Sequence, residues 1–471
     1  MKKIWSKTAS IALSIASFLS VACGCTAGNK AAYPNYFDST ENIKMYAFYG
    51  PGNGLYRDGS LMGDGTDMRT KERYQEYKDC GFDILLLENE APYRGEDWET
   101  SKVKEIMDIA FEVGLDVVVY DSRIWQLAVK GGSLIGQKIG TKMIYTQEDI
   151  NEVVAGYMKD YSKHPAYYGV YIVDEPSTEQ FGTFMECAEA VQACREDSFV
   201  HGCMLGYARE DEYAIQYKNR NVKNMGMDVY LWLYQRDQGQ PYSVINGGWF
   251  ETLHDYALFC AEHDIDLSAT TLQTFGSYDV FNAAGGYGWR PQNLEEVRYQ
   301  MYASLAFAPE YLVYHHYWQS RYGHSDGTIM DDYGNKLIYD EVQALNKETE
   351  EIRRVLGNFD YKGLHFYSDK RKLPYYYQIQ NDYEIKGIAC TGTNNETMIT
   401  ELYDEKKNYT AYMLMNTTDP SEDKISTITV EFKGCNYAVF YEKGTSKIVQ
   451  LKKGKYTFNL DSTEGCLVLP Y

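Results

Sequence analysis

The amino-acid sequence predicts an α/β protein, a (β/α)8 TIM barrel followed by a C-terminal antiparallel β-sandwich. From Lys44 to about Gly357, short apolar runs alternate with amphipathic stretches, which is typical of repeated βα units on a parallel sheet. After Gly357 the helical periodicity ends, and short alternating segments with turn residues follow, as in a sandwich. The length of 471 residues suits one barrel of about 250 residues and a smaller module.

Eight segments have the apolar character of barrel strands. Residues 84–87 and 117–119 are apolar without alternation, as expected of parallel strands that helices cover. The predicted strands are 45–49, 84–88, 116–121, 168–174, 200–207, 225–230 (with 234 as an alternative end), 268–275 and 311–318. The predicted helices are 101–113, 147–161, 178–194, 213–219, 249–263, 293–307 and 340–355, and the clearest sandwich strands are 409–415, 428–432, 438–441 and 456–460.

The N-terminus has the pattern of an export signal. Two lysines precede an apolar run over 11–22, and Cys23 follows directly. This pattern resembles a bacterial lipoprotein signal, although Ser20 stands where the usual motif has leucine. The resemblance implies lipidation of Cys23 and a protein held at the cell surface or the periplasmic side of a membrane, with a simple N-terminal membrane anchor as the alternative. The expected domains are a signal peptide (1–23), a flexible tether (24–42), the barrel (43–357) and the sandwich (358–471).

Composition narrows the class of partner. A net charge of −21 disfavours nucleic acid and anionic membrane surfaces, since phosphate neutralisation needs clustered Lys and Arg. The 45 tyrosines favour carbohydrate, because aromatic faces with hydroxyl tips suit sugar rings. The cysteines are scattered without a C-x-x-C pair, and no phosphate loop or serine-hydrolase elbow follows a strand. We therefore expect no cofactor and no metal.

The fourth predicted strand ends in two adjacent carboxylates, Asp174 and Glu175, followed by Pro176. In a barrel, reactive side chains project from the C-terminal ends of the strands. Adjacent carboxylates usually divide their roles, because repulsion and burial raise one pKa and leave the other group ionised. A protonated Glu175 would deliver a proton to a glycosidic oxygen while Asp174 binds a sugar hydroxyl. The alternative is a helix N-cap, a role that Ser177 could fill alone.

The barrel with Asp-Glu-Pro after strand four resembles clan A glycoside hydrolases, especially the family 42-like barrels. Their strand-four motif usually carries Asn-Glu with the glutamate as acid/base, which implies that role for Glu175. Residues 298–306 and 314–318 are similar to helix seven and strand eight of such proteins, which implies that Trp318 forms the platform under the sugar. The family's nucleophile is a glutamate that ends strand seven, yet Gln273 stands there.

Other strand ends offer a second carboxylate. Glu88 follows strand two, Asp121 ends strand three and Asp228 lies near the end of strand six, with Asp228 and Glu88 ranked first. Two of these have plainer alternatives, since Asp121 could pair with Arg123 and Asp228 could anchor Tyr230. A further alternative is a hexosaminidase mechanism that uses the acetamido group of the substrate.

Several polar and aromatic side chains near strand ends are candidates for sugar binding. Two adjacent histidines on a strand point to opposite faces, so we expect His316 to line the pocket and not to share a metal ion with His315. The candidate substrate-binding residues are Trp318, Gln273, Tyr230, Asp121, Arg123, His316 and Tyr207.

The expected function is hydrolysis of O-glycosidic bonds in an oligo- or polysaccharide at the cell surface. Gln273 at the end of strand seven motivates the alternative of a non-catalytic glycan-binding lipoprotein on a degenerate barrel. Another class of barrel enzyme is a third reading, since a fold does not determine its chemistry.

Overall fold

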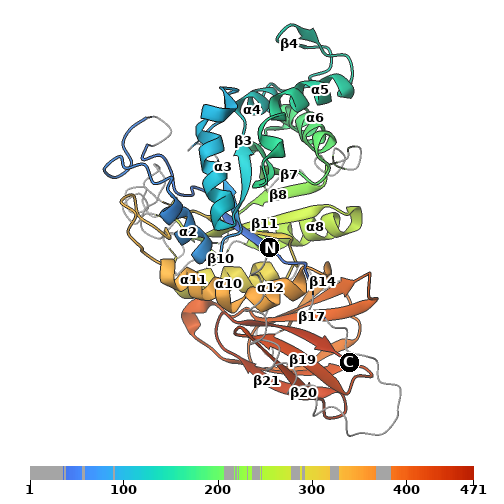
Figure 1. Ribbon diagram of the computed structural model, residues 1–471. Coiled ribbons are helices and arrows are strands. Elements are labelled where there is room, and N and C mark those ends of the chain that lie inside the picture. The colour runs from blue at the N-terminus through green and yellow to red at the C-terminus, as the bar shows by residue number, and fades with distance from the viewer. Residues whose placement is uncertain are drawn as a thin grey trace, which may run out of the picture.

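The computed structural model has the predicted fold class. Eight parallel strands close into a barrel in the order β1-β13-β11-β8-β7-β6-β3-β2, and antiparallel sheets follow it (Figure 1). The structure describes residues 36, 39–55, 59–87, 91–205, 217, 220, 222–230, 232–235, 244–245, 247–276, 287–288, 292–318, 328–367 and 383–471. The barrel strands are β1 (Lys44–Ala47), β2 (Ile84–Leu86), β3 (Asp116–Tyr120), β6 (Tyr167–Asp174), β7 (Phe199–Leu205), β8 (Asn224–Asp228), β11 (Asp266–Gln273) and β13 (Tyr311–His315).

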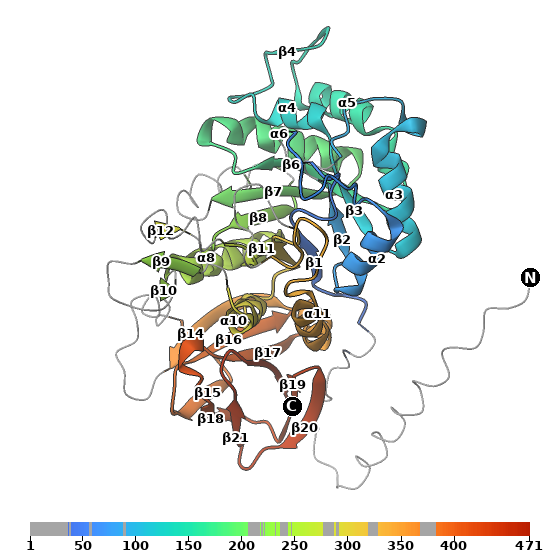
Figure 2. The same cartoon turned by 90° about the vertical axis from the view of Figure 1, so that its left-hand side faces the viewer.

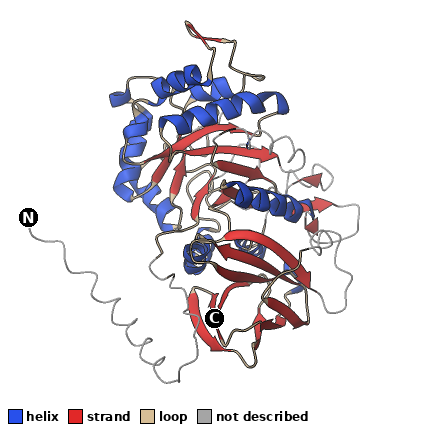
Figure 3. Cartoon of the chain, turned by 90° about the vertical axis from the view of Figure 1, so that its right-hand side faces the viewer, coloured by secondary structure: helices blue, strands red, loops and turns tan. Residues whose placement is uncertain are grey.

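Helices cover the outside of the barrel strands (Figure 3). Helix α3 shows why such segments are helical, since Ser101 caps its first turn and Gly114 ends it at a φ of 78°. Its buried residues, Val103, Ile106, Met107 and Ala110, recur at the spacing of one helix face. The helices of the barrel are α2 (Lys71–Asp79), α3 (Lys102–Val113), α4 (Ser122–Ala128), α5 (Gln147–Met158), α6 (Thr178–Cys194), α8 (Gly247–His263), α10 (Leu294–Leu305), α11 (Tyr339–Glu348) and α12 (Glu350–Leu356), with 3-10 turns at η1 (Trp98–Thr100) and η2 (Tyr161–Lys163).

Some elements were not expected from the sequence. Helix α2 buries only Tyr74 and Tyr77 among mostly charged neighbours, so its apolar face is too narrow to produce a clear periodic signal. Helix α4 has seven residues, and a hairpin of β4 (Lys138–Ile139) and β5 (Lys142–Met143) projects beyond α5 (Figure 1). A small sheet joins β9 (Trp232–Gln235), β10 (Val244–Ile245) and β12 (Tyr287–Gly288).

The sandwich consists of a six-stranded sheet, β14-β16-β17-β22-β19-β20, and a three-stranded sheet, β15-β18-β21. The larger sheet lies below α10 and α11 (Figure 2). Its central strands β17 and β22 are buried on both faces: Met413 and Leu467 belong to the core of the barrel helices, while Leu414 and Val468 pack toward the smaller sheet. The strands are β14 (Asp360–Tyr367), β15 (Ile388–Thr393), β16 (Thr397–Asp404), β17 (Tyr409–Asn416), β18 (Ser426–Phe432), β19 (Tyr437–Glu442), β20 (Thr445–Gln450), β21 (Lys455–Leu460) and β22 (Gly465–Pro470), with a 3-10 turn at η5 (Pro420–Glu422).

The predicted tether is too long at its C-terminal end. Tyr36 is fully buried, its hydroxyl donates to the Asp404 carboxylate over 2.8 Å, and its ring packs against Phe359. Tyr36, within the expected tether, is therefore part of the folded body. Within the described part of the chain, we find no helix with the length and apolar character needed to cross a bilayer.

Candidate active site

The C-terminal ends of β6 and β8 bring three carboxylates together. Asp174 ends β6, Glu175 follows it, and Asp228 ends β8. Strand β7 lies between them, with Cys203 opposite Asp174 and Leu205 opposite Asp228. The carboxyl of Asp228 is within hydrogen-bonding contact of the Glu175 carboxyl and of the Tyr230 hydroxyl. The strand-four and strand-six candidates therefore form one acidic cluster.

Glu175 has an unusual backbone conformation. Its φ is 45°, in the left-handed region that non-glycine residues seldom adopt. Its amide donates to the Cys203 carbonyl over 3.0 Å, which fixes the residue above β7, and its side chain is exposed. Such conformations cost roughly 1–3 kcal/mol and cluster at functional sites. The backbone therefore adds an observation in favour of Glu175 that the sequence did not contain.

Asp228 retains its proton more readily than an ordinary aspartate does. Burial raises its pKa well above the usual value, and the negative charges of Asp174 and Glu175 raise it further, while the hydrogen bond from Tyr230 acts in the opposite sense. Two carboxyl groups in contact are stable when they share one proton. The expected protonation of Glu175 stays a prediction, and the structure adds Asp228 as a neighbouring carboxyl with a raised pKa.

An aromatic and imidazole cluster lies beside the carboxylates. The Tyr230 ring contacts Phe275 at 4.8 Å and His315 at 5.5 Å between centroids, and Phe275 stacks on His316 at 5.2 Å. Burial raises the pKa of Tyr230, so its hydroxyl keeps its proton and remains a hydrogen-bond donor. Sequence reasoning placed Phe275 at the end of the predicted strand 268–275 without singling it out, and in the structure β11 ends two residues earlier, at Gln273.

The expected orientation of the two histidines is wrong. Their ring centroids lie 3.8 Å apart, and both rings contact Tyr49 and Phe275. Strand β13 ends at His315, so the alternation of side chains along a strand no longer applies to His316. His316 is 2% exposed and packs inside this cluster.

The barrel interior below the carboxylates holds a buried histidine that sequence reasoning also missed. Nδ1 of His201 lies 2.8 Å from the Tyr46 hydroxyl, and Nε2 lies 3.6 Å from Sγ of Cys203. Burial lowers the pKa of His201 to about 3, so the imidazole is neutral and acts through hydrogen bonds. The available signal was its place as the second residue of the predicted strand 200–207.

Two residues expected to bind substrate are covered by protein. Trp318 is 1% exposed, and the guanidinium of Arg73 lies 5.9 Å from its ring. Gln273 is fully buried, and its backbone amide donates to the Gln300 side chain over 2.8 Å. As the structure stands, neither offers a surface to a sugar, since contact with a ligand requires accessible atoms. The end of β11 carries no carboxylate, in line with the sequence.

Asp121 and Arg123 form a structural pair. The Arg123 guanidinium donates to both carboxylate oxygens of Asp121, over 3.0 and 2.6 Å, and Tyr161 donates to Asp121 over 3.1 Å. Asp121 is fully buried and caps α4 by accepting from the Arg123 amide. The alternative that Asp121 pairs with Arg123 therefore explains both residues, and we leave both out of the substrate site.

The helix-capping explanation of the strand-four carboxylates does not hold. Ser177 caps α6 by accepting from the Gln180 amide, and the Gln180 side chain accepts from the Ser177 amide in return. Asp174 and Glu175 precede this capping box and are not needed to start the helix. Their position at the mouth of the barrel calls for another explanation.

Some expected residues lie outside the described part of the chain. These are Glu88, Tyr207 and Cys23. Among the residues that the structure describes, no group of three His, Cys, Asp or Glu side chains is arranged to hold a metal ion, and the eight cysteines are free thiols.

Comparisons with known proteins show the fold and no closer relationship. No protein-family model matches the sequence, and no curated protein does. A protein described as "Glycoside hydrolase" aligns with a TM-score of 0.50 at 11% identity, over 91% of this chain and 98% of the other. A family 5 glycoside hydrolase from Bacteroides vulgatus aligns with a TM-score of 0.50 at 10% identity, over 91% and 89% of the two chains.

A third structure, a family 27 β-L-arabinopyranosidase from Geobacillus stearothermophilus in complex with arabinose, has a TM-score of 0.49 at 12% identity, over 93% of this chain and 99% of the other. The structural neighbours are glycoside hydrolases, and at these identities the likeness concerns the fold alone.

Proposed function

We propose that this protein is a glycosidase that hydrolyses O-glycosidic bonds of an oligo- or polysaccharide, with Glu175 and Asp228 as its proton-transferring pair. The observation that carries the proposal is the contact between these two carboxyls at the mouth of the barrel, where burial and charge hold a proton on Asp228. The structural neighbours with this fold are glycoside hydrolases, which supports glycoside hydrolysis as the class of reaction.

The chemistry follows from the exposure of each group. Glu175 is exposed and Asp228 is largely buried beside it, so Glu175 is the member that reaches a ligand. Glu175 gives a proton to the glycosidic oxygen as the bond to the leaving group breaks, and Asp228 passes its own proton to Glu175, which is general acid catalysis. A water molecule then adds to the anomeric carbon, and the proton that this water loses returns to the Glu175–Asp228 pair. Asp174, also exposed, supplies a negative charge to the oxocarbenium-like transition state.

The test is glycan cleavage by the wild type and by Glu175→Gln. Chromogenic glycosides and reducing-end release from plant, host and microbial polysaccharides identify a substrate first. The variant should then lose roughly 10²–10⁴-fold in kcat/KM, as expected on removing a general acid, with an unchanged unfolding midpoint. Glu179→Gln is the matched control, since Glu179 is exposed on the first turn of α6 and lies outside the cluster. Full residual activity in Glu175→Gln would contradict the proposal.

Asp228→Asn tests the second member of the pair. An amide cannot supply the proton that Asp228 holds, so this variant should also lose activity. Because the pKa of Asp228 is raised, the wild type should keep the proton, and its activity, to a higher pH than an ordinary aspartate would allow. The alkaline limb of the kcat/KM profile measures this.

A second candidate function is glycan binding without catalysis. It is favoured by Gln273 at the end of β11, where the resemblance implies a nucleophile. Retention of an oligosaccharide with no release of reducing ends over a long incubation would support it against the hydrolase.

We further propose that the protein is lipid-anchored through Cys23 at the cell surface. The basis is the N-terminal pattern of lysines, apolar run and cysteine. Metabolic labelling with a fatty acid should mark the wild type and leave Cys23→Ala unlabelled. Labelling that persists in Cys23→Ala would contradict the assignment.

A further inference from the structure

A pocket of about 550 Å³ lies among the loops that follow the first two barrel strands. Its lining carries three cations, Arg69, Arg94 and Lys102, and one acid, Glu96. Cations thus outnumber acids in the lining, while Asp67 and Glu105, just outside it, pair with Arg69 and Lys102. We call the group Arg69, Arg94 and Lys102 the cationic pocket.

The cationic pocket belongs to the same end of the barrel as Glu175. Arg94 and Glu96 follow the C-terminal end of β2, and Arg69 lies in the segment that runs from β1 to α2. In a barrel, the loops after the strands converge on the face that carries the active site. Glu175 and the cationic pocket therefore lie on the same face of the barrel.

The three cations differ in how far they are neutralised. Nε and Nη2 of Arg69 donate to the two oxygens of Asp67 over 2.8 and 2.7 Å, which orients the guanidinium. Nζ of Lys102 lies 2.8 Å from Glu105. Arg94 is exposed, and within the described residues no carboxylate forms an ion pair with it. Glu96 accepts from the Arg94 backbone amide over 2.8 Å, so it shapes the loop that presents Arg94.

The loop around Arg94 is held in place before any ligand binds. The Tyr93 amide donates to the Tyr120 carbonyl over 2.8 Å, and the Tyr93 hydroxyl donates to the Glu96 carbonyl over 3.1 Å. The Arg123 guanidinium packs 4.9 Å from the Tyr93 ring. At Gly95, with a φ of 86°, a Cβ would lie 2.6 Å from Arg123, so only glycine allows this packing. The buried Asp121–Arg123 pair thus positions the cationic pocket.

We propose that the cationic pocket binds the anionic group of an acidic saccharide, the carboxylate of a uronic acid or a sulfate ester. Guanidinium groups match the planar oxygens of such anions, and a preorganised loop reduces the cost of binding them. The pocket holds one such group, while the acidic surface disfavours a long polyanion. This inference rests on the proposed function and names the substrate class of the same site.

The experiment measures binding without turnover. Isothermal titration of the Glu175→Gln chain compares tetragalacturonate, a sulfated galactan tetrasaccharide and neutral galactotetraose. At least one acidic ligand should bind tenfold or more tighter than the neutral one, and the preference should weaken with salt. Whichever acidic ligand binds identifies carboxylate or sulfate as the group recognised.

Arg94→Gln in the same background should weaken binding of the acidic ligand about fivefold or more and leave the neutral ligand unaffected. Lys104→Gln is the control. Lys104 lies on α3, as Lys102 does, but it pairs with Asp108 and does not line the pocket. Equal affinities for acidic and neutral ligands, or no effect of Arg94→Gln, would overturn the inference. If the wild type cleaves neutral glycans alone, the proposed function stands and the inference about acidic saccharides fails. If the protein binds an acidic glycan but the wild type cleaves no glycan, the proposed function is overturned instead.

Discussion

At the scale of single residues, the environment of a carboxyl matters more than its position in the chain. Asp174 and Glu175 are neighbours in sequence, and Asp228, whose pKa is raised, reaches them from another strand. Burial disfavours the ionised form, and two nearby negative charges add to this effect. The pair that can exchange a proton is therefore formed through space.

A second buried carboxyl pair lies at the opposite end of the barrel. Glu310 precedes β13, and its carboxylate accepts from the Leu267 amide over 2.6 Å. Burial, with the charge of Asp266, raises the pKa of Glu310 to about 8. Burial also raises the pKa of Asp266 to about 6. These groups lie at the end of the barrel opposite the mouth. Residues at that end contribute to stability and not to catalysis.

Glu310 predicts a dependence of stability on pH. Its folded pKa lies above the unfolded value near 4.5, so its contribution is fully present below about pH 4.5 and is lost as the pH rises toward 8. Glu310→Gln should remove this loss, and its stability relative to the wild type should rise by up to about 1.4 kcal/mol per pH unit across that window. Urea unfolding at pH 5, 6.5 and 8 measures the difference. Glu112 is exposed, and the free energy of unfolding of the control Glu112→Gln should follow the same pH dependence as that of the wild type. The same pH dependence in Glu310→Gln would contradict the raised pKa of Glu310.

At the scale of elements, α6 starts at its own capping box, directly after the catalytic candidates. Ser177 and Gln180 satisfy each other's backbone amides, and Pro176 separates this cap from Glu175. The start of the helix and the chemistry of the strand end therefore use different residues. This division allows the two functions to be separated by mutation.

Ser177→Ala should lower the free energy of unfolding by about 1 kcal/mol, the usual cost of removing an N-cap hydroxyl. Asp174→Asn should leave the free energy of unfolding nearly unchanged and reduce glycan cleavage. Chemical denaturation and kcat/KM, measured on both variants, distinguish the two roles. Thr146→Ala, which removes the cap of α5, provides a matched control for the size of a capping effect. A stability loss in Asp174→Asn as large as in Ser177→Ala would show that Asp174 helps to start the helix.

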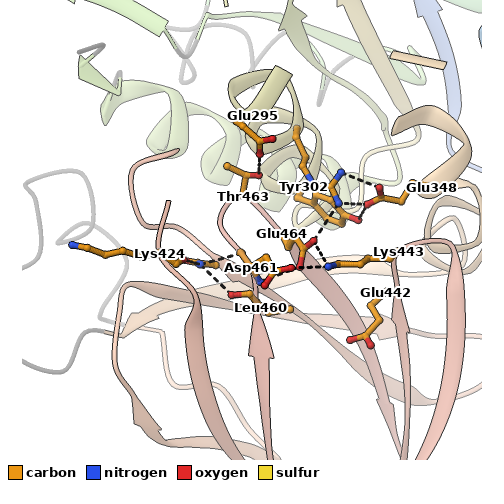
Figure 4. Close-up of polar contacts among 12 residues, drawn as sticks. Glu295, Tyr302, Glu348, Lys424, Glu442, Lys443, Leu460, Asp461, Thr463 and Glu464 are labelled. Atoms are coloured by element: carbon orange, nitrogen blue, oxygen red, sulfur yellow. Dashed lines mark hydrogen bonds and ion pairs between the residues drawn. The ribbon is translucent and has the colours of Figure 1, made fainter. Parts of the chain in front are cut away.

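At the scale of the whole molecule, the barrel and the sandwich share one interface of apolar and charged contacts. Glu348 on α11 accepts from Arg298 over 2.9 and 2.5 Å and from the Tyr302 hydroxyl over 2.5 Å. Glu464, in the turn before β22, lies 3.4 Å from Arg298 and 2.7 Å from Lys443 of the sandwich (Figure 4). The network thus links two helices of the barrel to two turns of the sandwich.

Removing the centre of this network should loosen the interface. Glu348→Gln leaves Arg298 partly buried with a weaker partner, and we expect a loss of roughly 1–3 kcal/mol. Differential scanning calorimetry should show a lower midpoint and a broader transition, since the two domains no longer unfold together. Glu442→Gln in the sandwich, whose carboxylate pairs only locally with Lys447, is the control. A variant with an unchanged midpoint and width would show that the apolar contacts alone hold the interface.

The sequence alone determined the architecture, because burial leaves a periodic record in the order of residues. Apolar runs at 84–87 and 117–119 predicted covered parallel strands, and the change of pattern near residue 357 agrees with the end of α12 at Leu356 and the start of β14 at Asp360. It also predicted that Asp174 and Glu175 end a strand, since a strand's end follows from local pattern and a proline.

Only the tertiary structure decided which side chains meet. The contact between Glu175 and Asp228 joins two strands that are not adjacent, and the burial of Trp318 and Gln273 depends on what packs over them. Beyond the last residue of a strand, the alternation of side chains no longer applies, which is why His316 and Phe275 lie where no pattern predicted. Packing and electrostatic contacts form between residues that are distant in the sequence. The sequence predicts them only where burial produces a repeating pattern of apolar residues.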